Sequence, residues 1–386
     1  MNAFTFSYPT RVYFGEKAAE KNLAAELQKH GPNVLLAYGR GSIKRNGVYD
    51  ELTAILSAAG KTVTEFTGIM SNPTYAKVQE GAKLARENHV DFILAVGGGS
   101  VIDCCKIVSA QAKLDTDIWD YEYAEHAMPR SFLPMGAVVT AFGTGAEMNN
   151  GAVITNTDKK LKTALWGASY DFAVLDPEYT MSMPMRQVIS GAFDTLSHCM
   201  ETYMGKPFGD NLSDEINEAV MRSVIKNLRA QIADPKDKNA RSELIWAAAM
   251  GENGILKIGK QTDFQCHMME HQLGAYTDCN HGMGLSAMHA QYYHYIATQG
   301  KEKLAKLAVR VWGVDPAGKS ELEIANAGID ALAAFIKEIG MPANLRELNI
   351  PDDLPWKEIA ESVNVTPGGC GKLNHEDILK IFEECR

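Results

Sequence analysis

Short apolar runs alternate with longer amphipathic segments through the first half of the chain. Runs rich in Val, Ile and Leu that alternate with helix-period segments are typical of a parallel sheet wrapped by helices. Ligands of such sheets lie beyond the carboxyl ends of the strands, so the glycine-bearing turns after three of the runs are candidate binding loops. The opening segment, residues 4–14, alternates like an edge hairpin. The predicted strands are Asn33–Tyr38, Lys61–Phe66, Asp91–Val96, Met135–Thr140 and Phe172–Leu175.

The pattern changes after residue 184, where long stretches of helical period replace the short apolar runs. This change predicts an α/β fold with a parallel-sheet domain, residues 1–184, followed by an all-helical domain, residues 185–386. The predicted helices of the second domain are 211–232, 239–256, 301–312 and 322–339.

Composition excludes several classes of protein. The 386 residues are 46% hydrophobic and 22% charged, as in ordinary globular proteins, and a net charge of −10 without a long basic run argues against nucleic acid. No apolar run reaches the roughly 18 to 20 residues needed to span a bilayer, so no membrane partner is expected. The seven cysteines are scattered and odd in number, which indicates reduced thiols and a cytoplasmic protein.

A glycine-rich turn follows the third predicted strand. Gly97, Gly98 and Gly99 would let the backbone approach a pyrophosphate, and the helix that follows would offer free N–H groups to the anion. The spacing differs from the usual G-x-G-x-x-G because Asp103 stands in the place of the third glycine. The turn by itself therefore leaves a plain structural loop open as an alternative.

The turn after the first long strand bears on the choice of nucleotide. No acidic residue follows Tyr38 until Asp50, whereas sites selective for NAD usually place a carboxylate near the ribose 2′-OH. This pattern favours NADP. The alternative is that Arg40, Lys44 and Arg45 are ordinary solvated cations.

Histidines and one aspartate indicate a metal site. Asp194 and His198 stand four residues apart, as do His267 and His271, so each pair leaves one face of a helix. Oxygen and nitrogen ligands without thiolate suit Fe(II), Zn(II), Co(II), Ni(II) or Mn(II). Spacing alone does not rank His267 above His271. Five of the ten histidines fall within 28 consecutive residues: His267, His271, His281, His289 and His294.

Taken together, the motifs resemble those of the iron-containing (group III) alcohol dehydrogenases. Within that family the chain is most similar to the branch of NADPH-dependent butanol dehydrogenases and broad-range aldehyde reductases, in residues 38–47 and 173–177. The motifs are Gly97-Gly98-Gly99-Ser100-x-x-Asp103-x-x-Lys106, Thr140-x-x-Gly143-Thr144-Gly145-x-Glu147, Asp194-x-x-x-His198, His267-x-x-x-His271 and His281-Gly282.

The resemblance implies a Rossmann-like N-terminal domain, an all-helical C-terminal domain of the dehydroquinate synthase-like architecture, and a cleft between them for NAD(P) and one divalent metal. It implies Asp194, His198, His267 and His281 as ligands of Fe(II) or Zn(II). His271 would then lie just outside the ligand set as a catalytic proton relay.

The resemblance also assigns the cofactor contacts, with NADP(H) preferred over NAD(H). It implies pyrophosphate contacts from the glycine turn, ribose and nicotinamide contacts from three residues further along the chain, and contacts near the adenosine 2′ position from the first turn. These residues are Gly97, Gly98, Gly99, Ser100 and Asp103; Thr140, Thr144 and Lys162; and Gly39 and Ser42, with Asn72 as a further cofactor contact.

The implied function is hydride transfer between NADP(H) and a primary alcohol or aldehyde such as butanol or butyraldehyde, with the metal as Lewis acid on the substrate oxygen. A homodimer that takes small-molecule substrates is expected. Three alternatives stay open: a polyol (glycerol-type) dehydrogenase, a dehydroquinate-synthase-like lyase, and a metal or nucleotide binding module without turnover. The side chains expected near the substrate are Phe142, Trp246, Phe264 and Tyr276, although Trp246 could equally be ordinary core.

Overall fold

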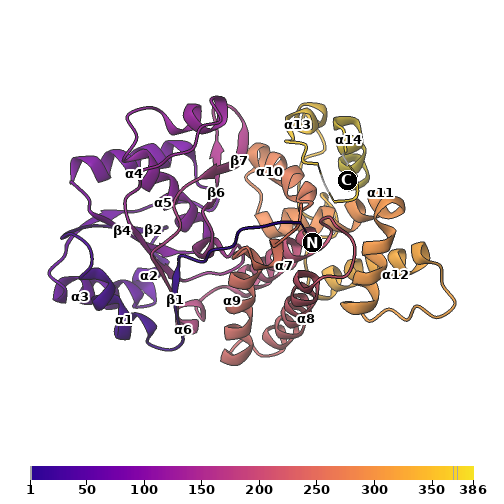
Figure 1. The fold of residues 1–386 in the computed structure, drawn as a ribbon, viewed down its shortest axis with the longest axis horizontal. Helices are drawn as coiled ribbons and strands as arrows, with labels where there is room; N and C mark the ends of the chain where they lie inside the picture. Colours follow the sequence, from indigo (N-terminus) through magenta and orange to yellow (C-terminus); the bar gives the residue numbers. More distant parts are fainter. Residues whose placement is uncertain (1, 368, 372) are drawn as a thin grey trace. The chain divides into compact units, whose positions relative to one another are not determined.

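The computed structural model describes residues 2–367, 369–371 and 373–386. The chain forms two compact units (Figure 1). The first, here called the sheet unit, comprises Ser7–Pro184 and Lys236–Ala249. The second, here called the helical unit, comprises residues 2–6, Met185–Pro235 and Met250–Arg386.

The sheet unit contains a six-stranded sheet in the order β1-β8-β5-β4-β2-β3, and every strand pair in it is parallel. The α/β prediction is confirmed, and all five predicted strands are present with small shifts at their ends. They are β2 (Asn33–Tyr38), β3 (Thr62–Phe66), β4 (Phe92–Gly97), β5 (Met135–Val139) and β8 (Phe172–Leu175).

The predicted edge hairpin at residues 4–14 is wrong. Only β1 (Arg11–Phe14) forms from that segment, and it pairs in parallel with β8. Its backbone bonds start with the Arg11 amide, which donates to the Asp171 carbonyl at 3.1 Å. Because Pro9 just before the strand has no N–H to donate, the preceding residues cannot continue an antiparallel ladder through that position. The alternation therefore marked a parallel edge strand.

An antiparallel hairpin of β6 (Gly151–Asn156) and β7 (Leu161–Trp166) lies apart from the main sheet and was not predicted. Side chains of a helix that is distant in the sequence but adjacent in space hold this hairpin in the sheet unit. The buried Lys106 ammonium donates to the Asn149 side chain at 2.9 Å, and the Asp103 carboxylate accepts from the Val153 amide at 2.9 Å. Local sequence could not reveal this support, since it comes from residues about fifty positions earlier in the chain.

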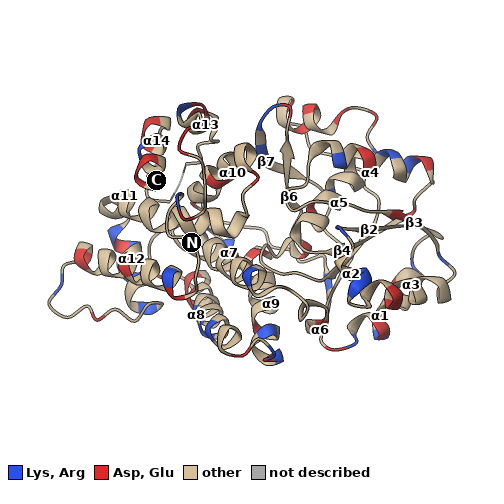
Figure 2. Ribbon diagram, turned by 180° about the vertical axis from the view of Figure 1, so that it is seen from behind, with Lys and Arg blue, Asp and Glu red and all other residues tan. Residues whose placement is uncertain are grey.

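Helices pack against the main sheet, and the core between them is apolar. Leu36, Leu94 and Val138 from neighbouring strands are fully buried together with side chains of the first and third helices. Figure 2 shows that the acidic and basic residues of this unit are intermixed on its helices. The helices are α1 (Ala18–Leu27), α2 (Ser42–Arg45), α3 (Val48–Ala58), α4 (Tyr75–Glu87), α5 (Gly99–Gln111) and α6 (Pro177–Thr180), with a π-helix at Asp120–Ala124 and a 3-10 turn at Ala146–Met148.

The described elements of the helical unit are α-helices and one 3-10 turn, Ile255–Lys257. The segment predicted at 211–232 is a helix whose N-terminus is capped by the Asn211 side chain. The segment predicted at 301–312 is only the end of a 30-residue helix. The helices are α7 (Met185–Tyr203), α8 (Leu212–Ala233), α10 (Gln265–Thr277), α11 (His281–Arg310), α12 (Glu321–Glu338), α13 (Trp356–Ser362) and α14 (His375–Glu384).

The expected division into residues 1–184 and 185–386 differs from the two units in one helix and in the first residues. Most of α9 (Lys238–Glu252) belongs to the sheet unit. The Trp246 ring lies edge-on to Phe14 with centroids 6.0 Å apart, and the buried Arg241 guanidinium donates to the Thr180 carbonyl. Helical period identified α9 as a helix, but not the unit against which it packs.

Among the described residues, no helix has the length and apolar character needed to cross a membrane.

Candidate metal centre and cofactor loops

One face of α7 presents three polar side chains to the interior of the helical unit. Asp194, His198 and Glu201 stand at positions i, i+4 and i+7, which places them in one row along the helix. All three are buried, and Glu201 is fully inaccessible. Buried carboxylates require partners of opposite charge or strong hydrogen bonds, so this row calls for a counterpart.

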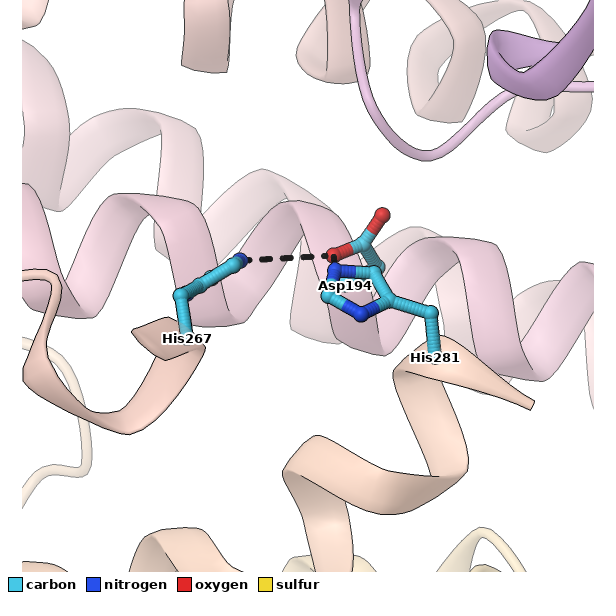
Figure 3. Close-up of side chains that lie close together, drawn as sticks. All are labelled: Asp194, His267 and His281. Carbon is cyan, nitrogen blue, oxygen red and sulfur yellow. Dashed lines mark ion pairs between the residues drawn. The ribbon is translucent and has the colours of Figure 1, made fainter. Parts of the chain in front are cut away.

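Two histidines from other helices supply part of that counterpart. His267 lies in the first turn of α10 and His281 is the first residue of α11, and both rings point toward the Asp194 carboxylate (Figure 3). The Nε2 atoms lie 3.7 Å and 3.4 Å, respectively, from Asp194 Oδ1. The His198 ring centroid is 4.3 Å from that of His267. The structure thus brings together the four side chains that the resemblance implied as ligands.

The donor atoms fit a cation. Within the described part of the chain, Asp194 Oδ1 and His267 Nε2 are buried and have no hydrogen-bond partner, which is costly for such groups. Burial would raise the pKa of Asp194, but the histidines around it, His198 first, hold that pKa well below its usual range. Burial likewise opposes protonation of His267, yet Glu201 and Asp194 raise its pKa to about 10. Both shifts indicate a site that favours positive charge, as a divalent ion would supply.

In each histidine ring, the hydrogen bond at Nδ1 determines which nitrogen is left to bind a metal. His198 Nδ1 is 2.8 Å from the backbone carbonyl of Asp194, one helical turn earlier. His267 Nδ1 is 2.5 Å from Glu201 Oε1, and His281 Nδ1 bonds Glu270 Oε2. Sequence analysis missed both glutamates. Their spacing, seven residues after Asp194 and three after His267, is the signal that could have found them.

His271 lies next to His281 at the edge of the metal centre, and it is not among the side chains grouped around Asp194. It follows His267 by one turn of α10, is buried, and its ring centroid is 5.6 Å from that of His281. Nitrogen and oxygen atoms of Glu270, His271 and His281 lie within 4.8 Å of one another. Its placement agrees with the position expected of a proton relay, while the role itself stays a prediction.

The other two clustered histidines have separate places. His289 is fully buried in α11, where its Nε2 lies 2.6 Å from the Ser197 hydroxyl and burial lowers its pKa to about 4. His294 Nε2 lies at the surface, 4.0 Å from Asp330. His289 Nε2 also lies 3.6 Å from Glu201 Oε1, so this ring lies beside the carboxylate that bonds His267. Crowding in the sequence therefore overstated the number of histidines that face Asp194.

The glycine turn of the sheet unit joins β4 to α5. Gly97 ends the strand, Gly98 caps the helix without a side chain, and Gly99 begins it. A Cβ on Gly99 would lie 2.3 Å from Thr144 Oγ1, so the turn has no room for a side chain there. The Ser100 hydroxyl donates to the Ser71 carbonyl at 2.6 Å. Close backbone packing at the N-terminus of a 13-residue helix is suited to an anion.

Asp103 has partners inside the sheet unit. Its carboxylate accepts from the Val153 amide and lies 3.3 Å from the buried Lys106 ammonium. These bonds tie α5 to the β6-β7 hairpin, and Lys162 stands on that hairpin opposite Thr155. The pyrophosphate contact expected of Asp103 stays a prediction, and the bonds it makes support the hairpin.

The remaining expected cofactor residues follow the strands. The Thr140 amide donates to the Gly97 carbonyl at 2.9 Å, directly after β5. The Thr144 hydroxyl accepts from the Ala146 amide at 3.2 Å. Asn72 is half-buried in the segment between β3 and α4. Thr140 and Thr144 thus lie beyond β5, next to the glycine turn after β4.

At the first turn, an acid that is distant in sequence changes the electrostatics. Lys44 Nζ lies 3.2 Å from Glu65 of β3 and 4.3 Å from the centroid of the Tyr49 ring. Lys44 is therefore not an isolated surface cation, and an acid does lie near this turn. A Cβ on Gly39 would come within 3.3 Å of the Ile69 carbonyl, while Ser42 begins α2.

The aromatic residues expected near the substrate divide into separate groups. Phe264 packs on the metal centre, with its ring centroid 5.1 Å from that of His267. The Tyr276 hydroxyl donates to Glu358 at 2.8 Å near the end of α10. Phe142 is buried in the sheet unit, and Trp246 is 40% exposed there, so Trp246 is not ordinary core.

Comparisons with known proteins agree over the whole chain. Residues 9–177 match the family model described as iron-containing alcohol dehydrogenase, and residues 188–385 match that of the C-terminal part of the same family. NADH-dependent butanol dehydrogenase A of Clostridium acetobutylicum is 37% identical over 100% of both chains. NADPH-dependent aldehyde reductase YqhD of Escherichia coli is 34% identical over 91% of this chain and 90% of its own.

Solved structures show the same fold. The crystal structure of NADH-dependent butanol dehydrogenase A from Thermotoga maritima superposes with a TM-score of 0.94 and 32% identity, covering 100% of this chain and 99% of that one.

Proposed function

Because this chain belongs to the iron-containing alcohol dehydrogenase family, we propose that it transfers hydride between NADP(H) and a primary alcohol or aldehyde such as butanol or butyraldehyde. Membership confirms the resemblance seen in the motifs, and makes the chain an NAD(P)-dependent alcohol dehydrogenase or aldehyde reductase. The observation that carries the finer proposal is the buried set of Asp194 with three histidines, whose unpartnered atoms fit a cation.

Asp194, His198, His267 and His281 would hold one divalent ion, Fe(II) or Zn(II). Such an ion supplies Lewis acidity to a carbonyl oxygen, and a reduced nicotinamide supplies the hydride. The polypeptide's part is to position these groups and to manage the proton. His271, buried beside His281, would hold the proton that the developing alkoxide needs.

NADP(H) as the preferred cofactor is supported by the first turn of the sheet unit. Relatives carry names that specify either NADH or NADPH, so the family alone does not decide. Gly39 leaves no carboxylate at the end of β2, and the nearby Glu65 is engaged by Tyr38, Tyr49 and Lys44. Since Lys44 offsets the charge of Glu65 and the two tyrosines donate hydrogen bonds to it, the adjacent exposed Arg40 leaves the turn favourable to a 2′-phosphate.

A paired assay tests the proposal. Purified protein is analysed for divalent metal, and the rates of NADPH- and NADH-dependent butyraldehyde reduction are measured for wild type and His267→Ala. We expect about one ion per chain, faster reduction with NADPH, and loss of metal and of activity in the variant.

The same assay, extended to alcohol oxidation and to NADPH binding, shows which results would contradict the proposal. Metal-free wild type that reduces the aldehyde at full rate would remove the metal from the reaction. A preference for glycerol over butanol in the oxidation direction would favour a polyol dehydrogenase. Tight NADPH binding without turnover would favour a binding module. The homodimer and the cytoplasmic location stay predictions, and the mass in solution would test the first.

A further inference from the structure

The three histidines of the metal centre are oriented by three different partners. His198 uses the carbonyl of Asp194 in its own helix, at 2.8 Å. His267 uses the Glu201 carboxylate, and His281 uses the Glu270 carboxylate. Both glutamates are fully buried. A carboxylate at Nδ1 fixes the proton there and leaves the lone pair on Nε2, the atom that faces Asp194 Oδ1 in both rings.

The residues that bond these histidines connect α7, α10 and α11 in chain order. Helix α7 carries Asp194 and His198 and also Glu201, which holds the ring of His267 on α10. Helix α10 in turn carries Glu270, which holds the ring of His281 at the start of α11. Helices α7 and α10 therefore each provide a metal-centre side chain of their own and the support for the histidine of the next helix, while α11 provides His281.

We propose that Glu201 and Glu270 are positioning residues of the metal centre, which fix His267 and His281 with Nε2 directed toward Asp194 and thereby set the affinity for the divalent ion. This inference rests on the proposed metal site. The two carboxylates also add negative charge next to the ligand rings, which favours a cation.

The two glutamates differ in what else they support. Helix α10 starts after Phe264, which provides no side-chain cap. Glu201 accepts from the backbone amides of Cys266 at 2.9 Å and His267 at 3.2 Å, so it caps that helix from outside. Glu270 lies in the middle of α10, where no cap is needed, and contacts the Cys279 thiol at 3.8 Å. Removing either glutamate should weaken metal binding, and removing Glu201 should in addition lower the stability of the fold because it leaves the start of α10 without its cap.

The experiment measures metal affinity apart from turnover. Full-length protein is stripped with a chelator, and Co(II) and Zn(II) are titrated in competition with a chromophoric chelator while the Co(II) absorption band is recorded. The variants are Glu270→Ala, Glu270→Gln and Glu201→Gln. Glu218→Gln is the matched control, because Glu218 is also a buried carboxylate of the helical unit, but it is bonded to Tyr203 and Arg310.

We expect Glu270→Ala to raise the Kd for Co(II) by about 10- to 100-fold and to change the absorption band. Glu270→Gln, which keeps an acceptor oxygen for His281, should recover part of that loss. Glu201→Gln should weaken binding and also lower the Tm of the metal-free protein more than Glu270→Gln does. Glu218→Gln should bind Co(II) within about twofold of wild type, as expected of a residue outside the ligand support.

Wild-type affinity and an unchanged absorption band in Glu270→Ala would overturn the inference, as would an equal loss in Glu218→Gln. Because the metal site itself is proposed, the wild type separates the two failures. Wild type that binds Co(II) while the glutamate variants bind equally well overturns the positioning role alone. Wild type that binds neither Co(II) nor Zn(II) overturns the metal site and this inference together.

Discussion

The metal centre of the helical unit and the glycine turn of the sheet unit are built from different parts of the chain. Side chains make the first: Asp194, His267 and His281 converge from three helices, with both Nε2 atoms facing the Asp194 carboxylate. Backbone makes the second, where Gly97, Gly98 and Gly99 leave no room for side chains beside Val101, Ala141 and Thr144, respectively. A metal site depends on residue identity at a few positions, whereas a phosphate turn depends on the close approach of main-chain groups.

The two units also differ in the pKa of a buried carboxylate. Burial alone would raise the pKa of Glu201, yet the histidines beside it, His267 first, lower that pKa. In the sheet unit, Glu147 is equally buried near Lys106, and burial raises its pKa to about 7. The partner, and not the depth of burial, therefore decides whether a carboxylate stays charged.

Substituting His271 gives the largest effect that leaves the metal in place. His271→Ala should lower kcat for butyraldehyde reduction by about 10²- to 10⁴-fold, the usual loss on removing a proton relay. Metal content and the Kd for NADPH should not change. Elemental analysis and single-turnover kinetics measure these quantities. Loss of the ion with the activity would mean that His271 is a ligand, and the distinction between ligands and relay would be wrong.

Removing Lys106 tests how strongly the sheet unit depends on one buried cation. Its ammonium lies 3.3 Å from Asp103 and donates to Asn149 and to the Gly151 carbonyl. Lys106→Met should reduce the free energy of unfolding by about 3–5 kcal/mol, because it leaves Asp103 buried without its cation. Denaturant titration measures the loss, and Lys83→Met on the surface of α4 is the control. A change below about 1 kcal/mol would show that Asp103 needs no cation.

A side chain at the glycine turn should affect the cofactor and not the metal. Gly99→Ala places a methyl group against Thr144, and the displacement of the turn should cost about 1–3 kcal/mol of NADPH binding, or about 10- to 100-fold in Kd. Fluorescence titration with NADPH measures the affinity. If Gly99→Ala left the NADPH affinity unchanged and reduced the metal content, the assignment of the cofactor to the glycine turn would be wrong.

An effect of similar size depends on pH. Since burial raises the pKa of Glu147 to about 7, the folded state keeps a proton that the unfolded chain loses near pH 4.5. Stability from this group is present below pH 4.5 and is lost as the pH rises toward 7. Glu147→Gln should therefore be more stable than wild type by about 1–3 kcal/mol above pH 7 and equal to it in acid. Urea unfolding at several pH values measures both free energies of unfolding. If Glu147 were charged at every pH, the two free energies would change with pH in parallel, and the prediction would be wrong.

Much of the fold could be predicted because most strands of this sheet are apolar runs. Four of the five predicted strands, β2, β4, β5 and β8, are buried on both faces, so their sequences carry a clear signal, whereas β3 at the sheet edge is partly exposed. The β6-β7 hairpin carried no such signal, because Lys106 and Asp103 from α5 hold it in place. Helix α9 was predicted as a helix but not as part of the sheet unit, since Trp246 and Arg241 make their contacts with residues far away in the chain.

Period, spacing and residue type are local properties, and they were enough to predict the order of sheet and helices, the glycine turn and a pool of candidate ligands. The resemblance to the family, and not spacing, ranked His267 above His271 within that pool. Three features depend on contacts that only folding creates: Glu201 and Glu270 orient two of the histidines, His289 lies beside Glu201, and Glu65 forms an ion pair with Lys44. The physical reason is that hydrogen bonds and ion pairs act over a few ångströms in space, and folding brings such partners together across 11 to 92 positions of sequence.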